Sequence, residues 1–266
     1  MSGHNKWSKI KGKKGAADAI RGRMFSRLAK ELAVAARQGG GDPNVNASLR
    51  SIIQRCRTIS MSSDNIERGI KKGTGELQSK ALEEITYETY AQGSVALVIL
   101  ALTDSKNRAA ADIRRTLENK GSTLAAQGSV SRLFKRKGII SVSGLPMIKW
   151  DGAEEGFLVD FVMENIANGA EDVTETGESC FEVTTEPGKI HQLAEALTAT
   201  EKFKVDKAET SLVPSLLVKV SDMQVAKSVI SLVDALEELE DVQEVHTNMD
   251  LDDEVLKKIE AEEPKE

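Results

Sequence analysis

A row of cationic side chains on the first expected helix is the feature of this sequence that best fits a chemical role. The row consists of Arg23, Arg27, Lys30 and Arg37, which are spaced four, three and seven residues apart. Residues at these spacings share one side of a helix, here beside its apolar face. Cations spread along about 20 Å of helix match the repeat of phosphate groups on a polynucleotide, and binding would release condensed counterions. The row therefore predicts a contact with a polyanion.

Other basic residues extend this predicted contact along the chain. Arg21 belongs to the same helix, and Arg50 and Arg57 lie seven residues apart on a second expected helix. The first 14 residues form a basic arm that could enter a groove or follow a backbone, with Lys6, Lys9, Lys11, Lys13 and Lys14. Trp7, set among these lysines, could stack on a base or ribose, or could anchor the arm as an apolar plug. A solvated basic face without a ligand is the alternative for the whole set.

The net charge changes sign along the 266-residue chain and favours the same contact. Residues 1–80 hold 17 Lys or Arg against 6 Asp or Glu, a net charge of +11, and residues 81–140 have a net charge of +3. Residues 141–266 have a net charge of −20, so that the whole chain has a formal net charge of −6. We expect the basic end to contact polyanions and the acidic remainder to be repelled by them.

The residue types needed for catalysis or metal binding do not occur in a suitable pattern. The three histidines, His4, His191 and His246, lack ligand spacing, and the two cysteines, Cys56 and Cys180, lie outside any C-x-x-C pattern. The sequence has no G-x-S-x-G motif, and its triple-glycine run lacks the Lys-Ser/Thr of a phosphate loop. We expect no catalytic residue, no metal and no cofactor, although an acid pair of a hydrolase in an inter-domain cleft would escape sequence reasoning.

Two short segments beside the most apolar run, residues 95–102, could form a functional loop. Before the run stand Tyr90, Gln92 and Gly93, and after it stand Thr103, Asp104, Asn107 and Arg108. Sites often lie at the ends of strong strands, but these residues lack a catalytic partner. For Asp104 we favour a structural role, in which its carboxylate accepts hydrogen bonds from the first-turn amides of the next helix.

The candidate binding residues must be positioned by helices and strands. The pattern of apolar residues in the first 75 positions predicts three amphipathic helices. The first spans residues 16–38 and ends at the glycines 39–41. Asp42 and Pro43 are a cap and first-turn pair for the second, and the third spans residues 62–73. Their short connections are typical of a small helical bundle.

The rest of the chain alternates strands with helices. We expect strands at 85–90 and 95–102 and a helix at 106–120. The next segment has the split βαβ order of ferredoxin-like units. Its expected elements are strand 139–143, helix 155–168, strands 171–174 and 179–185, helix 187–199 and strand 203–207. A strand near Ser211, a helix at 221–239 and a strand at 242–247 would complete the sheet that begins at residue 85.

Together the elements predict an α+β multidomain protein. We expect a three-helix bundle followed by two α+β domains with ferredoxin-like split βαβ character, the third inserted into the second. The expected domains are residues 1–79, residues 80–135 with 208–250, and residues 136–207, followed by an acidic tail, 251–266, that frays. No apolar run approaches the roughly 20 residues of a membrane-spanning helix, and no signal peptide is readable, so we expect a cytoplasmic protein.

Several short motifs are distributed over the whole chain. They are Gly3-His4-Asn5-Lys6-Trp7, Lys13-Lys14-Gly15-Ala16-Ala17-Asp18-Ala19, Arg21-Gly22, Gly39-Gly40-Gly41-Asp42-Pro43, Leu102-Thr103-Asp104 with Asn107-Arg108, Gly128-Ser129-Val130 and Asp241-Val242-Gln243-Glu244-Val245. Together these motifs resemble the YebC/PmpR family, which includes mitochondrial translational activators. The resemblance implies a three-domain, non-enzymatic protein. It also implies a probable transcriptional regulator or, as in some members, a ribosome-associated factor that relieves stalling at proline-rich stretches.

The chain departs from the family pattern in two places. Where the family usually has Tyr-Gly-Pro-Gly-Gly, this chain has Tyr90-Ala91-Gln92-Gly93-Ser94. Where the family tends to have Thr-Asp-Asn-Arg-Asn-Arg, Ser105 and Lys106 occupy the middle. The first change removes a rigid proline and a permissive glycine, so we expect the geometry of that loop to differ.

Our leading hypothesis is a nucleic-acid-binding regulator of gene expression. Its partner would be ribosomal RNA or DNA, and in a translational role the ribosome. The alternative is a protein-interaction adaptor whose acidic body recruits a basic partner. Phosphate attraction is common to RNA and DNA, so the sequence does not decide between them. It also leaves the oligomeric state open, and a monomer is our working expectation.

Overall fold

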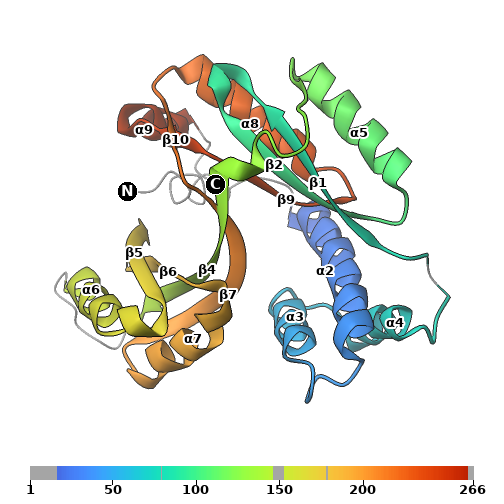
Figure 1. The fold of residues 1–266 in the computed structure, drawn as a ribbon, viewed down its shortest axis with the longest axis vertical. Coiled ribbons are helices and arrows are strands. Elements are labelled where there is room, and N and C mark those ends of the chain that lie inside the picture. Colours follow the sequence, from blue (N-terminus) through green and yellow to red (C-terminus); the bar gives the residue numbers. More distant parts are fainter. Residues whose placement is uncertain (1–16, 79, 146–152, 178, 263–266) are drawn as a thin grey trace.

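The computed structural model describes residues 17–78, 80–145, 153–177 and 179–262 (Figure 1). Within these residues the fold combines a group of helices at the N-terminal end with two four-stranded antiparallel sheets, each covered by helices. The expected mixture of α and β structure is confirmed. No helix in the described part of the chain is long and apolar enough to cross a membrane.

Within the described residues, three helices form the N-terminal bundle, namely α2 (Ala17–Gly39), α3 (Ala47–Thr58) and α4 (Ser63–Thr74). Their apolar faces meet around Leu28, Leu32, Leu49, Ile52, Ile53, Cys56 and Ile66. As predicted, α2 ends in the glycine run, where Gly40 takes a left-handed conformation with φ of 82°. Helix α4 begins behind Ser62, whose side chain accepts a hydrogen bond from the N–H of Asn65.

The start of α3 differs from the prediction. Asp42 and Pro43 belong to the turn between α2 and α3, and Asn46 is the N-cap of α3. The amide of Asn46 also donates hydrogen bonds to the carbonyl oxygens of Ala35 (2.9 Å) and Gly40 (2.8 Å) at the end of α2. Asn46 is therefore the better cap because it joins two helices, a tertiary contact that the local sequence pattern does not show.

The first sheet has the strand order β3-β1-β2-β9, and all neighbouring strands are antiparallel. Its strands are β1 (Glu83–Tyr90), β2 (Ala96–Thr103), β3 (Thr123–Leu124) and β9 (Val242–Thr247). Helices α5 (Lys106–Asn119) and α8 (Met223–Glu237) pack against one face of the sheet. The core between them includes Leu97, Ile99, Ile113, Leu117, Val233 and Leu236. On the other face, Ala96 and Val98 pack against Val130 and Phe134.

The second sheet has the order β5-β6-β4-β7, again with antiparallel neighbours throughout. Its strands are β4 (Phe134–Gly144), β5 (Ala170–Gly177), β6 (Cys180–Thr185) and β7 (Phe203–Pro214). Two helices pack on it, α6 (Glu154–Glu164) and α7 (Ile190–Ala199), and the short η4 (Pro187–Lys189) precedes the second. This strand order, with helices after the first and third strands, is that of a split βαβ unit.

Strands β4 and β7 extend beyond their predicted ends and join the two sheets. The strand expected near Ser211 is not separate, because Ser211 lies in β7 and pairs with Lys137 of β4. At the far end of this pair, Phe134 and Leu212 pack against the first sheet. The two strands run without a break through residues 135/136 and 207/208, where we expected domain boundaries, so one ribbon contributes to both cores (Figure 1).

Residues 249–262 are folded, contrary to the prediction of a fraying acidic tail. Strand β10 (Met249–Leu251) pairs in parallel with β8 (Val218–Val220), and α9 (Asp253–Glu262) follows. Val255 and Ile259, four residues apart, are buried in the first core. The acidic composition hid this short apolar face, and burial of that face stabilises the helix.

The close crossing of α4 over α2 depends on Gly73. A Cβ atom at this position would lie against the carbonyl oxygen of Ala33 and 2.7 Å from the Cβ of Ala36. We expect Gly73→Ala to lower the free energy of unfolding by about 1–3 kcal/mol through overpacking, as measured by chemical denaturation. Gly22→Ala in α2 is the matched control, because no atom lies within 4 Å of its Cβ position and alanine favours a helix. Equal losses in the two variants would contradict the role given to Gly73.

Candidate nucleic-acid interface

The structure separates the predicted cationic row of α2 into two parts. The guanidinium of Arg27 donates a hydrogen bond to the backbone carbonyl of Glu237, at the end of α8. The ammonium of Lys30 donates to the carbonyl oxygen of Glu240 (3.0 Å) and to Oδ1 of Asp241 (2.8 Å). Burial lowers the pKa of Arg27, although the charge of Glu237 opposes this effect. Arg27 and Lys30 therefore hold α2 against the α8–β9 turn.

Asp241 is the centre of this contact and lies in the turn immediately before β9. Its side chain is 7% exposed and accepts hydrogen bonds from Lys30 and from Nε (3.2 Å) and Nη2 (2.9 Å) of Arg108 in α5. Its backbone carbonyl accepts the N–H of Leu102 at 2.8 Å. Burial alone would raise the pKa of Asp241, but the hydrogen bonds from Lys30 and Arg108 outweigh burial and hold that pKa below its ordinary value. The Asp241 carboxylate thus joins α2, α5 and β9.

The motif at the end of β2, Thr103-Asp104 with Asn107-Arg108, supports the contact at Asp241. Asp104 does not cap α5 as predicted: the N-cap residue is Ser105, which has no side-chain cap bond, and Asp104 pairs with Arg108 at 2.8 Å. The hydroxyl of Thr103 accepts a hydrogen bond from the N–H of Ser105 (3.0 Å), and Asn107 is exposed. Asp104 is better placed to orient Arg108 towards Asp241, because both acids bind the same guanidinium.

The Tyr90–Ser94 segment includes the end of β1 and the turn into β2, and it approaches α8 at Gly93. The hydroxyl of Tyr90 donates to the carbonyl oxygen of Ser129 at 3.1 Å, and η1 (Gln92–Ser94) leads into β2. Gly93 has a φ of 75°, and a Cβ there would lie 2.8 Å from Cγ1 of Val225. Ser94 has a φ of 60°. The family motif usually has glycine at this position, and glycine adopts this left-handed conformation more easily than serine does. The departure from the family pattern therefore places a strained residue in this turn.

A buried carboxylate that sequence reasoning missed holds the neighbouring loop. Glu88 in β1 is 3% exposed and accepts hydrogen bonds from the backbone N–H groups of Gly128 (2.8 Å), Val130 (2.5 Å) and Ser131 (3.0 Å). Residues 131–133 form the short η2. Burial would raise the pKa of Glu88, but the three backbone hydrogen bonds outweigh burial and lower it. The only sequence signal was an acid at a position of β1 that faces the interior.

The other predicted cations within the described residues lie on α2 and α3. Arg37 is exposed two turns beyond Lys30, Arg21 is exposed near the start of α2, and Arg23 is half-buried. Arg50 and Arg57 are exposed on α3. The six predicted arm residues, Lys6, Trp7, Lys9, Lys11, Lys13 and Lys14, lie outside the described residues. Arg37, Arg50 and Arg57 are therefore the predicted residues best placed to meet a polyanion.

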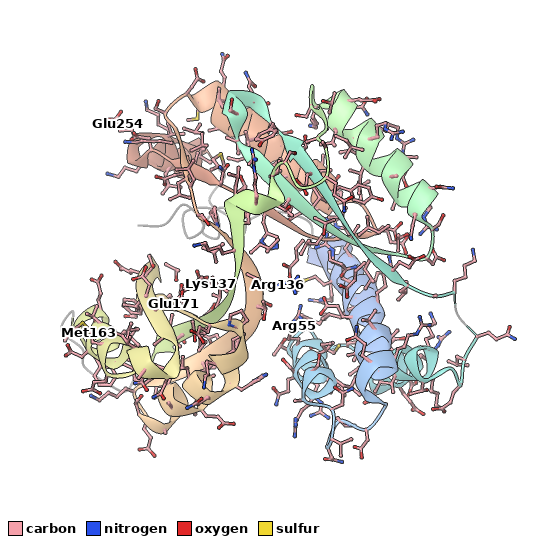
Figure 2. The ribbon with its side chains drawn as sticks, in the orientation of Figure 1. Arg55, Arg136, Lys137, Met163, Glu171 and Glu254 are labelled. Atoms are coloured by element: carbon pink, nitrogen blue, oxygen red, sulfur yellow. The ribbon has the colours of Figure 1, made fainter. Side chains whose placement is uncertain are left out.

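Other cations of the bundle extend or limit this surface. Arg68 on α4 is exposed and was missed, although the third expected helix is visibly rich in lysine and arginine. Arg55 of α3, labelled in Figure 2, instead takes part in an ion pair within the bundle. Its guanidinium lies 2.7 Å from the carboxylate of Glu31 of α2. Burial raises the pKa of Glu31 even though Arg55 opposes the shift. Among the residues that the structure describes, no three His, Cys, Asp or Glu side chains are grouped so as to hold a metal ion.

Comparison with known proteins gives a consistent result over the whole chain. A family model described as the TACO1/YebC protein N-terminal domain matches residues 5–76, and one described as the TACO1/YebC second and third domain matches residues 82–249. A probable transcriptional regulatory protein of Fusobacterium nucleatum is 41% identical over 97% of this chain and 100% of its own. One from Thermosipho melanesiensis is 44% identical over 98% of each chain. The crystal structure of a conserved hypothetical protein from Aquifex aeolicus matches with a TM-score of 0.78 at 39% identity, covering 91% of this chain and 95% of that one.

The contact at Asp241 predicts that Asp241→Asn loosens the N-terminal bundle. The variant leaves Lys30 and Arg108 without their shared counter-charge, and we expect a loss of about 1–3 kcal/mol in docking free energy. Faster hydrogen exchange in α2 would measure the change. Because the pKa of Asp241 is lowered from 3.8 in the folded chain, its contribution is present above pH 3.8 and is lost as the pH falls through the lowered pKa.

The matched control is Asp112→Asn, which breaks a more exposed pair with Arg115 on α5 (3.1 Å). We expect almost no effect from this substitution because exposed ion pairs contribute little. Unchanged exchange in α2 of the Asp241→Asn variant would show that the carboxylate does not hold the bundle.

The loop around Glu88 gives a second prediction. In Glu88→Gln an amide nitrogen would replace one acceptor oxygen and face backbone N–H donors, so we expect the free energy of unfolding to fall by about 1–3 kcal/mol at neutral pH. Since the pKa of Glu88 is lowered on folding, the wild type should lose more stability than the variant as the pH falls below 4.5. Glu84→Gln, at an exposed position of the same strand, is the control and should change neither quantity. Parallel stability curves for wild type and Glu88→Gln would refute this role.

Proposed function

Because the chain belongs to the TACO1/YebC family, we propose that it regulates gene expression by binding nucleic acid, without catalysing a reaction. The observation that carries the proposal is the exposure of three arginines of the N-terminal bundle, Arg37 on α2 and Arg50 and Arg57 on α3, which we call its cationic surface. Residues 1–80 have a net charge of +11, so the arm and this surface together attract phosphates. The names of the relatives, probable transcriptional regulatory proteins, support a regulatory role.

The interface divides its cations between two tasks. Arg27 and Lys30 hold α2 on the body through Glu237, Glu240 and Asp241, so their role is to orient the bundle. The exposed arginines of α2 and α3, with the lysine-rich arm, contact phosphates. Phosphate contacts position a protein but carry no sequence information, so they serve equally for promoter DNA and for ribosomal RNA. The finer proposal is therefore a transcriptional regulator or a ribosome-associated translation factor that eases stalling at proline-rich stretches in the cytoplasm.

We also propose that the three largest hydrophobic cores of the described residues correspond to three domains. The bundle core is one, and the core of the first sheet is a second, built from segments on both sides of the second sheet in sequence. The core of the second sheet is the third, inserted domain. The ribbon of β4 and β7 makes the junction between the last two continuous, so we place their boundary within these strands.

The double variant Arg50→Ala/Arg57→Ala tests the phosphate-binding role. We expect weaker binding to RNA and to DNA of any sequence, and a plot of log binding constant against log salt that is flatter by about two contacts. Fluorescence anisotropy with labelled oligonucleotides over a range of salt concentrations would measure both quantities. Lys257→Ala/Lys258→Ala is the control, because it removes the same charge from exposed positions of α9. Equal loss of slope in both double variants would mean that only net charge matters and that α3 is no interface.

Crosslinking of the full chain to nucleic acid in cells would separate the two finer roles. Recovery of ribosomal RNA supports the translational role, and recovery of promoter DNA supports the transcriptional one. Recovery of neither, with Arg50→Ala/Arg57→Ala unchanged in binding, would overturn the proposed function.

A further inference from the structure

Helix α6 carries apolar residues on more of its circumference than the second sheet covers. Leu158, Phe161 and Val162 are buried against the sheet. Val159 is 40% exposed and Met163 is 65% exposed, and Ile166 in the short η3 (Ile166–Asn168) that follows is 60% exposed. These three residues, spaced four and three apart, lie on one side of the helix, which we call the outer apolar face. At 3.6 residues per turn the buried and exposed apolar residues together cover an arc of roughly 200°.

The neighbouring helix α7 shows what this position in the fold ordinarily requires. It packs on the same sheet through Ile190, Leu193 and Leu197. Its exposed positions carry no large apolar side chain: they are His191, Gln192, Glu195, Thr198 and Ala199. A helix that only covers a sheet needs one apolar face. The outer apolar face of α6 is therefore surplus to folding, and clustered exposed apolar residues of this kind mark an interaction surface.

The charges around the outer apolar face select the kind of partner. Glu155 lies one turn before Val159 on the same side, and Asp160 and Glu164 are exposed beside it. Residues 153–207, which include α6, hold 13 Asp or Glu and 4 Lys. This rim repels nucleic acid and anionic membrane surfaces and attracts a cationic protein segment. Aliphatic side chains at helical spacing suit the apolar side of another helix.

We propose that the outer apolar face of α6 binds a basic amphipathic helix of a partner protein. The partner helix places two or three aliphatic side chains on Val159, Met163 and Ile166, and its lysines or arginines pair with Glu155, Asp160 and Glu164. Met163 lies at the outer edge of its lobe, on the side away from α2, α3 and α4 (Figure 2). The partner site is therefore separate from the cationic surface of the bundle, and it does not rest on the proposed function.

The experiment captures partners on the purified full-length chain from nuclease-treated lysate and compares four forms of the chain by quantitative mass spectrometry. The forms are wild type, Met163→Asp, Leu216→Asp and the charge-reversal variant Glu155→Lys/Asp160→Lys/Glu164→Lys. Leu216 is the matched control, because it is 64% exposed and stands between β7 and β8, apart from α6. All four forms should unfold at similar denaturant concentrations, since the changed side chains are exposed.

We expect at least one protein whose recovery falls about tenfold or more in Met163→Asp, as for the loss of a central interface residue, and stays unchanged in Leu216→Asp. The charge-reversal variant should lose the same protein. The purified partner should bind the chain directly, and the segment protected from hydrogen exchange in it should be a helix with lysines or arginines beside its aliphatic residues.

Other results overturn the proposal. One is that all four forms capture the same set of proteins. Another is a partner whose protected segment is acidic or lacks aliphatic residues. The third is that the species whose capture depends on Met163 is a second copy of this chain. Nucleic-acid binding gives the independent control. Met163→Asp should keep the salt dependence of the wild type, and Arg50→Ala/Arg57→Ala should keep the partner, so that failure of either proposal leaves the other standing.

Discussion

The carboxylate of Asp241 fixes where the N-terminal bundle lies on the rest of the protein. It is almost fully buried and binds Lys30 from α2 and Arg108 from α5. A buried anion is costly without such partners, and the two cations would repel each other without the anion between them. The three charges therefore depend on one another. Because the backbone carbonyl of Asp241 also accepts a hydrogen bond from the N–H of Leu102, the orientation of α2 is tied to β2, an inner strand of the first sheet.

This contact changes how the charge asymmetry of the chain is understood. The acidic remainder repels external polyanions, but it also attracts the basic helix of its own chain, through the α8–β9 turn. Position along α2 decides which task a cation performs. Arg27 and Lys30 face the turn and are engaged there, whereas Arg37 lies two turns further on and is exposed. A row of cations on a helix thus does not by itself reveal how many of them a ligand can reach.

The sequence predicts those parts of the fold that depend on local signals. Strand β9 has its predicted bounds, and the glycine run and Ser62 mark helix ends correctly, because turns and caps are set by neighbouring residues. The missed features depend on contacts distant in sequence. Asn46 is favoured as the N-cap of α3 because its side chain also binds the end of α2. The acidic C-terminal segment forms a helix because Val255 and Ile259 are buried in the first core.

The same distinction explains the candidate site. Cationic residue types and their spacing were visible, but the structural roles of Asp241 and Glu88 were not. Each of these acids is separated by a long stretch of sequence from the groups that it binds. The acids look like ordinary surface charges until folding buries them.

The ribbon of β4 and β7 fixes the position of the outer apolar face of α6 relative to the first sheet. Phe134 and Leu212 are packed against the first sheet at one end, and Ile140 is buried in the second core towards the other. A pair of strands held at both ends by buried side chains resists bending, because bending would open one of the cores. Since the Asp241 contact fixes the bundle to the first sheet, the exposed arginines of α3 and the outer face of α6 belong to one connected framework. The proposed polyanion site and the proposed partner site therefore lie on different parts of this framework, and binding at one would leave the other accessible.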